Sequence, residues 1–171
     1  RDHQNAAGVP DVDVAITTRE LGRMIQQAGI DFKALKDEKF DDPFGIGSGA
    51  GVIFGATGGV MEAALRTAVE KLTGESLASV DFTEVRGTEG IKEATYTVAG
   101  KQINVAVAHG LANAKKLCEE IKNGTSKYHF IEIMGCPGGC VNGGGQPIQS
   151  AFVRRNTDIR ALRASVLYNI D

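Results

Sequence analysis

The sequence from residue 128 to residue 147, YHFIEIMGCPGGCVNGGGQP, carries most of the information about the fold of this chain. Its first seven residues are mostly apolar, which predicts a largely buried strand over residues 128–134. A glycine-rich block follows, in which five of the eight residues from Gly138 to Gly145 are glycine. Because each glycine adds freedom to the unfolded chain, we expect this backbone to adopt positive φ or to press closely against a bulky bound group.

Two cysteines, Cys136 and Cys140, lie four residues apart within this block. Thiolates favour iron–sulfur clusters, zinc or copper(I), so the pair indicates a metal centre. Structural zinc sites use similar spacing, which leaves half of a zinc site as an alternative. Other ligands for a closed zinc site fit poorly, because Cys118 is expected as a buried, inert thiol on a helix. His109 and His129 lack zinc-finger spacing from the pair.

Helices alternate with strands along the rest of the chain. Thr17 and Glu20 form a capping-box pattern at the start of one helix, and Gly29, Gly74 and Gly124 are placed to end helices. The sequence predicts strands over residues 12–17, 82–86, 91–98, 102–108 and 128–134, and helices over residues 18–28, 32–35, 61–73, 111–123 and 158–168.

Three of these helices carry an apolar face that we expect to be buried. The residues on these faces are Leu21, Met24, Ile25 and Ala28, then Met61, Leu65, Ala68 and Leu72, and finally Ala114, Leu117, Cys118 and Ile121. Glu62, Arg66 and Glu70 are expected on the solvent-exposed face of the second of these helices.

This order of elements predicts an α/β fold. We expect a layered, partly parallel sheet with an antiparallel hairpin that turns at residues 99–101, flanked by helices. The sequence shows no linker or internal repeat, so residues 1–171 are expected to form a single domain. Ligands of such sheets bind beyond the carboxyl ends of the strands, which is where the block with the two cysteines begins.

Composition argues against several classes of partner. Nineteen basic and 21 acidic residues give a net charge of −2, so nucleic acid is not an expected partner. No apolar run approaches the ~20 residues of a membrane span, so no membrane is expected either. Three cysteines do not suggest a disulfide framework, and we expect the cytoplasm, with the periplasm as the alternative. The earlier glycine cluster, residues 45–51, does not fit the dinucleotide-binding template.

Residues 132–147 resemble the last of the three signature segments of iron-only hydrogenases, written E-x-M-x-C-x-x-G-C-x-x-G-G-G-Q-P. Residues 48–66, 85–87, 90–94 and 163–168 are similar to further stretches of the same family. The resemblance extends from about Val12 onward. It implies one lobe of the catalytic domain, in the C-terminal part of the large subunit.

The resemblance also implies site residues by their position. Cys136 would be a ligand of a four-iron cubane, and Cys140 would be the thiolate that bridges this cubane to a two-iron centre with carbonyl and cyanide ligands. Met134 would pack against the two-iron part. The further residues implied around the cluster are Phe54, Gly55, Gly138, Gly139, Gly143, Gly144 and Gln146.

The two earlier signature segments of the family, with the remaining cubane cysteines, are absent from this sequence. The resemblance therefore implies a fragment that is inactive without the N-terminal part of the catalytic domain. It implies as further partners an electron carrier, such as ferredoxin or NAD(P)-linked subunits, and maturation factors. The alternative is a non-catalytic cluster-binding relative, either an assembly factor or a hydrogen sensor. Met134 and residues 143–147 favour the catalytic branch over an assembly factor.

Overall fold

A computed structural model describes residues 8–38, 49–74, 82, 85–87 and 90–170. The chain divides into two compact units, a smaller one of residues 1–41 with 144–148 and a larger one of residues 42–143 with 149–171. The division falls inside the second glycine block, between Gly143 and Gly144. The single domain expected over residues 1–171 stays a prediction.

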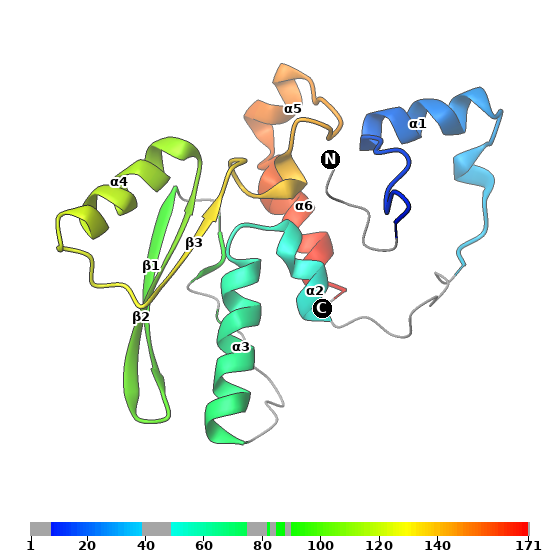
Figure 1. The fold of residues 1–171 in the computed structure, drawn as a ribbon. Helices are drawn as coiled ribbons and strands as arrows, with labels where there is room; N and C mark the ends of the chain where they lie inside the picture. Colours follow the sequence, from blue (N-terminus) through cyan, green and yellow to red (C-terminus); the bar gives the residue numbers. More distant parts are fainter. Residues whose placement is uncertain (1–7, 39–48, 75–81, 83–84, 88–89, 171) are drawn as a thin grey trace. The chain divides into compact units, whose positions relative to one another are not determined.

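The elements of both units are shown in Figure 1. The smaller unit contains α1 (Thr18–Gln27) and the 3-10 helix η1 (Phe32–Ala34). The larger unit contains α2 (Gly49–Val52), η2 (Ile53–Gly55), α3 (Gly59–Thr73), β1 (Ile91–Val98), β2 (Lys101–His109), α4 (Leu111–Lys122), β3 (Phe130–Met134), η4 (Cys140–Asn142), α5 (Ala151–Asn156) and α6 (Ile159–Tyr168). None of the helices in the described ranges combines the length and hydropathy that a membrane span requires.

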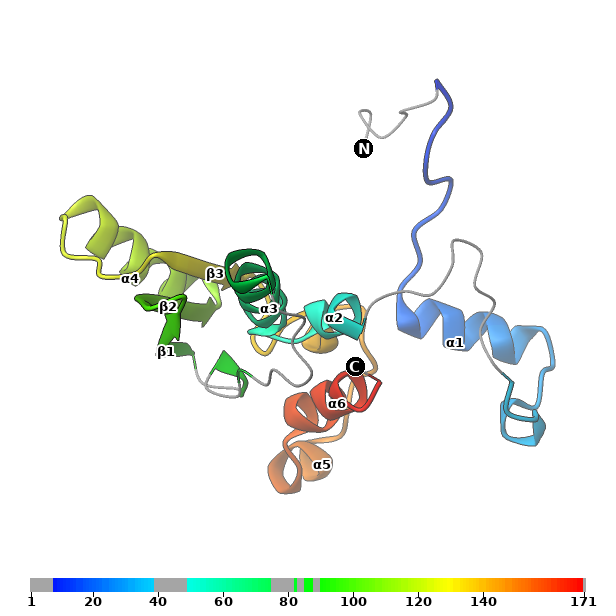
Figure 2. The same cartoon turned by 90° about the horizontal axis from the view of Figure 1, so that it is seen from below.

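The sheet has the order β1-β2-β3, and the turned view in Figure 2 shows β2 between its two neighbours. β1 and β2 form an antiparallel hairpin whose turn residues Ala99 and Gly100 both have positive φ, at 49° and 76°. β3 runs parallel to β2 after the crossover through α4, and Met134 pairs with His109 at the carboxyl ends. The predicted α/β fold, with its partly parallel sheet, its hairpin and its flanking helices, is confirmed.

The two faces of β2 build two cores. Alternate residues of a strand point to opposite faces, so β2 contributes Val105 and Val107 to the core with α3, and Ala106 and Ala108 to the core with α4. Figure 1 shows α3 and α4 on opposite sides of the sheet. The first core contains Met61, Leu65, Phe82, Val85, Val105 and Val107, and the second contains Ala106, Ala108 and Leu117.

The start of α3 is packed so tightly that only glycine fits there. Gly58 is the N-cap and has a φ of 91°. A Cβ atom on Gly58 would lie 2.0 Å from the carbonyl oxygen of Val85, and one on Gly59 would lie 1.8 Å from that of Ile53. These contacts join the first turn of α3 to the loops on either side of it.

Several expected strands are wrong. Residues 12–17 form no strand, and Val12, Val14 and Ile16 are exposed because the described residues of the smaller unit offer no strand to pair with. The described residues of the predicted strand 82–86 are not in a strand either, and Phe82 and Val85 pack against α3 instead. β3 begins at residue 130 and is buried only at Glu132, since it is an edge strand.

Several apolar helix faces are less buried than expected. Leu21 and Met24 of α1 are about half exposed, because a unit of this size builds little core. On α3 and α4, Ala68, Leu72, Cys118 and Ile121 are exposed. Glu62, expected in solvent, is instead buried. The sequence also gave no prediction of α2 or α5.

The helix termini are predicted well. The capping box of Thr17 and Glu20 is present, with the Thr17 hydroxyl accepting from the Glu20 N–H at 3.2 Å. Gly29, Gly74 and Gly124 each have positive φ just after a helix. α4 and the last helix lie where the sequence predicts them. Residues 39–48 lie outside the described residues.

We predict that Gly59→Ala destabilises the protein, because the new methyl group would collide with the Ile53 carbonyl. The loss of unfolding free energy should be about 1–3 kcal/mol or more, measured by urea denaturation. Gly22→Ala in α1 is the matched control, since nothing lies within 4 Å of its added methyl group. Equal stability of the two variants would contradict the packing at α3.

Candidate metal centre

The cysteine loop, defined as residues 135–143, starts where β3 ends. Its first residue follows Met134, whose carbonyl oxygen accepts the Gly110 N–H at 2.8 Å. Because Gly110 directly precedes α4, this bond ties the end of β3 to the start of that helix. The loop therefore leaves the sheet from a fixed point.

Two tight turns present the cysteines. The Gly139 N–H donates to the Cys136 carbonyl at 3.0 Å, and the Gly143 N–H donates to the Cys140 carbonyl at 2.9 Å. Between them, Gly138 and Gly139 have φ values of 87° and 98°, in the region that favours glycine. Both cysteines are free and exposed.

The glycine loop, defined as residues 53–58, lies directly against the cysteine loop. The Thr57 N–H donates to the Gly138 carbonyl at 3.1 Å. A Cβ atom on Gly139 would lie 2.6 Å from the Thr57 nitrogen and 2.7 Å from the Gly55 oxygen. The sequence led us to expect either positive φ or close packing against a bulky bound group at these glycines. The structure shows the positive φ, and the close packing that it shows is against the protein's own backbone.

A buried carboxylate joins the same two regions from the side of the sheet. Glu132 lies on β3 and is 6% exposed. Its carboxylate accepts the Gly58 N–H at 2.7 Å and the Met61 N–H at 2.6 Å. It thus satisfies two backbone donors at the N-terminus of α3, where negative charge is favoured.

Helix α6 packs against both loops. The Arg163 guanidinium donates to the carbonyl of Val141, the residue after Cys140, at 3.0 Å. Leu167 lies so close to Gly55 that a Cβ atom there would be 2.7 Å from its Cδ1 atom. The helix therefore limits the movement of each loop from the same direction.

A second buried carboxylate, Glu62 of α3, explains why that helix differs from the sequence pattern. Its side chain is 0% exposed and pairs with Arg66 at 2.8 Å and Arg86 at 2.6 Å. The Arg86 guanidinium also lies 4.2 Å from the ring centroid of Tyr168 on α6. Burial, with a smaller contribution from the Glu62 carboxylate, raises the pKa of Tyr168 to about 12.

The predicted site residues are divided between the two units. Cys136, Cys140, Met134, Phe54 and the glycines up to Gly143 belong to the larger unit, where Met134 is half-buried and Phe54 is 47% exposed. Gly144 and Gln146 belong to the smaller unit, in which the Gln146 carbonyl accepts from Arg19 at 3.4 Å. The structure describes these two residues within that unit only.

Comparison with known proteins identifies the family. The family described as "Iron only hydrogenase large subunit, C-terminal domain" matches residues 1–144. The chain is 54% identical over 148 residues, 86% of its length, to the periplasmic [Fe] hydrogenase large subunit of Nitratidesulfovibrio vulgaris, of which it covers 35%. This chain belongs to the iron-only hydrogenase family.

Other members of the family match the chain as well. It is 49% identical to the NADP-reducing hydrogenase subunit HndD of Solidesulfovibrio fructosivorans, over 96% of this chain and 27% of that protein. A solved [FeFe]-hydrogenase HydA1 variant from Chlamydomonas reinhardtii superposes with a TM-score of 0.73 and 40% identity, over 99% of this chain and 49% of that one. The chain thus spans about a third of these curated relatives and about half of the solved protein. A more distant match is the mouse cytosolic iron-sulfur assembly component 3, 33% identical over 80% of this chain and 29% of that protein.

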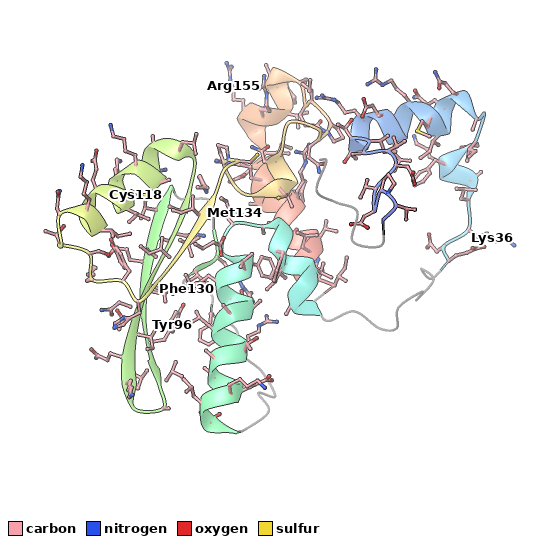
Figure 3. All side chains as sticks on the ribbon, viewed as in Figure 1. Lys36, Tyr96, Cys118, Phe130, Met134 and Arg155 are labelled. Atoms are coloured by element: carbon pink, nitrogen blue, oxygen red, sulfur yellow. The ribbon has the colours of Figure 1, made fainter. Side chains whose placement is uncertain are left out.

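The donor set of this chain fits part of an iron–sulfur centre. Two exposed thiols on adjacent turns are suitable soft ligands, but a cubane takes four. Within the described ranges no third histidine, cysteine, aspartate or glutamate joins them. His129 is engaged elsewhere, with its Nδ1 accepting from Asn104 at 3.0 Å, and Cys118 lies on α4, apart from Met134 on β3 (Figure 3).

Sequence reasoning missed the residues that hold the two loops in place. Glu132 is the first residue of the signature segment, yet its bonds to the start of α3 join positions 71 and 74 residues away. Arg163 and Leu167 lie in a family-like stretch but reach the loops only through the packing of α6. The sequence offered one indication of these contacts, because Glu132 is a single carboxylate within an otherwise largely apolar strand pattern.

We predict that all three thiols of the unloaded 171-residue chain react with a maleimide under native conditions. Cys118, Cys136 and Cys140 are exposed, so mass spectrometry should find three adducts without denaturant. The denatured chain is the control for complete labelling. Modification of Cys118 only after denaturation would instead support the buried thiol expected from the sequence.

We predict that stability falls with pH in the range where Tyr168 differs between the folded and unfolded states. An unfolded tyrosine ionises near its ordinary pKa of about 10. In the folded protein, burial raises the pKa of Tyr168 to about 12. Between these values the unfolded state binds fewer protons, so the free energy of unfolding decreases as pH rises. Tyr168→Phe should reduce this decrease in urea midpoints measured between about pH 9 and about pH 12. Identical pH dependences would refute the assignment.

Proposed function

We propose that the complete protein is a hydrogenase that interconverts molecular hydrogen with two protons and two electrons, and that this chain is the C-terminal part of its catalytic domain. The observation that supports this most directly is the pair of exposed thiols in the cysteine loop. The pair lies within a sequence 54% identical to a protein named as a hydrogenase.

In the proposed site, Cys136 would be a ligand of a four-iron cubane, and Cys140 would be the thiolate shared by that cubane and a two-iron centre. The cluster supplies the redox chemistry of hydrogen, which side chains lack. The contribution of this chain is to hold two thiolates in fixed turns. The bonds from Gly139 and Gly143 to the cysteine carbonyls support that contribution, as does the backbone contact with the glycine loop.

Apolar side chains of this chain would exclude water and oxygen from the cluster. We assign this function to Phe54 and Met134, with Gly55 beside them. The exposure of Phe54, 47%, leaves its ring available for such a contact. Gly138 and Gly139 are engaged with Arg160 and the glycine loop, so we propose that they shape the loop. Gly143, Gly144 and Gln146 are proposed to surround the cluster.

The proposed centre needs ligands from outside this chain. Two thiolates leave a cubane two ligands short, and this chain covers only 35% and 27% of the two hydrogenase relatives. We therefore propose that the N-terminal part of the catalytic domain completes the site and that the chain is inactive alone.

The proposed partners are an electron carrier and maturation factors that assemble the cluster. The electron carrier is a ferredoxin or an NAD(P)-linked subunit, and the name of the NADP-reducing relative supports the second. We propose the cytoplasm as the compartment, with the periplasm as the alternative that the name of another relative favours.

A second candidate is a non-catalytic cluster-binding protein. The identity of 33% to a named iron-sulfur assembly component supports this reading. The identities of 54% and 49% to named hydrogenases favour the catalytic reading more strongly. A hydrogen sensor remains the third possibility, because it would share the same cluster ligands.

We predict that Cys140→Ser in the complete protein, matured with its cluster, abolishes hydrogen evolution from a reduced dye. A serine hydroxyl is a much poorer iron ligand than the thiolate that it replaces, so the iron content should fall as well. Cys118→Ser is the matched control, because Cys118 is equally free and exposed but lies on α4. Full activity of the Cys140 variant would refute the assignment.

We predict further that the 171-residue chain alone evolves no hydrogen after chemical reconstitution with iron and sulfide. Two thiolates from one chain cannot complete a four-cysteine cluster. Gas chromatography of the headspace measures the product, and the complete protein serves as the positive control. Activity of the chain by itself would contradict the shared site, whereas a complete protein that binds iron but is inactive would support the binding reading.

A further inference from the structure

Glu132 is a buried ionisable residue to which the proposed function assigns no task. It stands on β3, two residues before Met134 and four before Cys136. Its exposed fraction is 6%, and both of its carboxylate oxygens are used: Oε1 accepts from Gly58 and Oε2 from Met61. A buried carboxylate with two short bonds to backbone is costly to replace.

The two donors occupy special positions on α3. Gly58 is the N-cap and Met61 is the third residue of the helix, so these are the two N–H groups that a capping box satisfies. In a capping box the two acceptors come from the helix's own side chains. Gly58 has no side chain to offer, and one carboxylate from the sheet supplies both acceptors instead.

This replacement has a mechanical consequence. Gly58 directly follows Thr57, whose N–H holds the Gly138 carbonyl of the cysteine loop at 3.1 Å. Gly139 in turn packs on Gly55, next to Phe54. The cysteine loop is therefore connected to the glycine loop twice, once directly and once through β3 and Glu132. Both connections hold the cysteine loop against the glycine loop, to which Phe54 belongs.

We infer that Glu132 is a positioning residue, which fixes the cysteine loop with its two thiols against the glycine loop with Phe54 by capping α3 from the sheet. The inference rests on the proposed function, because the position of the thiols matters for activity only if they bind a cluster. The position itself can be measured without a cluster. Glu132 does not contact the reacting atoms. It acts through the backbone of Gly58 and Met61.

Glu132→Gln is the variant that tests this inference. The amide keeps the shape of the side chain but turns one acceptor into a donor, which then faces a backbone N–H. Glu132→Asp keeps both acceptors on a shorter side chain and is expected to rescue part of the effect. Glu119→Gln is the matched control, because it makes the same change on the exposed surface of α4.

Hydrogen exchange of the unloaded complete protein gives the first readout. In Glu132→Gln, the amides of Gly58, Met61, Gly139 and Gly143 should exchange faster by about tenfold or more, whereas Val105 and Val107 in the β2 core should not change. An equal acceleration in the core would show general destabilisation and overturn the inference. Unchanged exchange in the cysteine loop would overturn it as well.

The matured protein gives the second readout. We expect Glu132→Gln to lower kcat with little change in the KM for the reduced dye, and to alter the paramagnetic resonance spectrum of its cluster. A normal spectrum and normal kcat in the folded variant would refute positioning. If Glu132→Gln fails to fold, the same measurements are made on Glu132→Asp. Failure of both variants to fold would assign Glu132 to folding alone and refute the inference.

The controls separate this inference from the proposed function. If the unsubstituted protein is inactive, or if Cys140→Ser is fully active, the proposed function fails while the exchange result for Glu132 still stands. If Cys140→Ser is inactive and Glu132→Gln behaves like Glu119→Gln, the proposed function holds and the positioning role of Glu132 fails.

Discussion

The close approach of two backbones, at Gly139 and residues 55–57, is the constraint on which the rest of the larger unit depends. At a distance of 2.6–2.7 Å from a would-be Cβ atom, no side chain fits at residue 139. Glycine there costs conformational entropy, and the structure offsets that cost with the bond from Thr57 to Gly138 and with the packing of α6. Because the two cysteines lie on either side of Gly139, this contact restricts the conformation of the turns that present their thiols.

A cluster of charged groups around Glu62 stabilises the packing of α6, which supports the two loops. Glu62, Arg86 and Tyr168 come from three separate stretches of the sequence and meet in one cluster, in which Glu62 is buried and the other two are partly buried. A buried carboxylate without cations would be strongly unfavourable, so the two arginines around Glu62 are required partners. The cluster holds α6 against α3, and α6 in turn supports both loops through Arg163 and Leu167. Loops supported by rigid elements in this way keep their side chains closely positioned.

Sequence patterns correctly predicted the helix ends and the hairpin, because these features depend on interactions between residues close together in the sequence. The capping box at Thr17, the glycines that end α1, α3 and α4, and the hairpin at Ala99 depend on residues within a few positions of one another, and all are present. Burial could not be predicted equally well. The apolar faces of α1 and the second half of α3 look like core faces in sequence, yet Leu21 and Leu72 are exposed in this structure. Burial depends on which other surfaces are present, and this chain spans about half of a solved relative.

The sequence alone identified two candidate soft metal ligands, because two cysteines at this spacing in a glycine-rich block need no tertiary contact to be recognised. It also determined the α/β class, since the alternation of helices and strands is visible along the chain. Only the tertiary structure decided how the loops are held. Glu132 reaches Gly58 across 74 residues, and Arg163 reaches Val141 across 22. Such bonds form between residues that the fold brings together, and no periodicity or spacing in the chain encodes their partners.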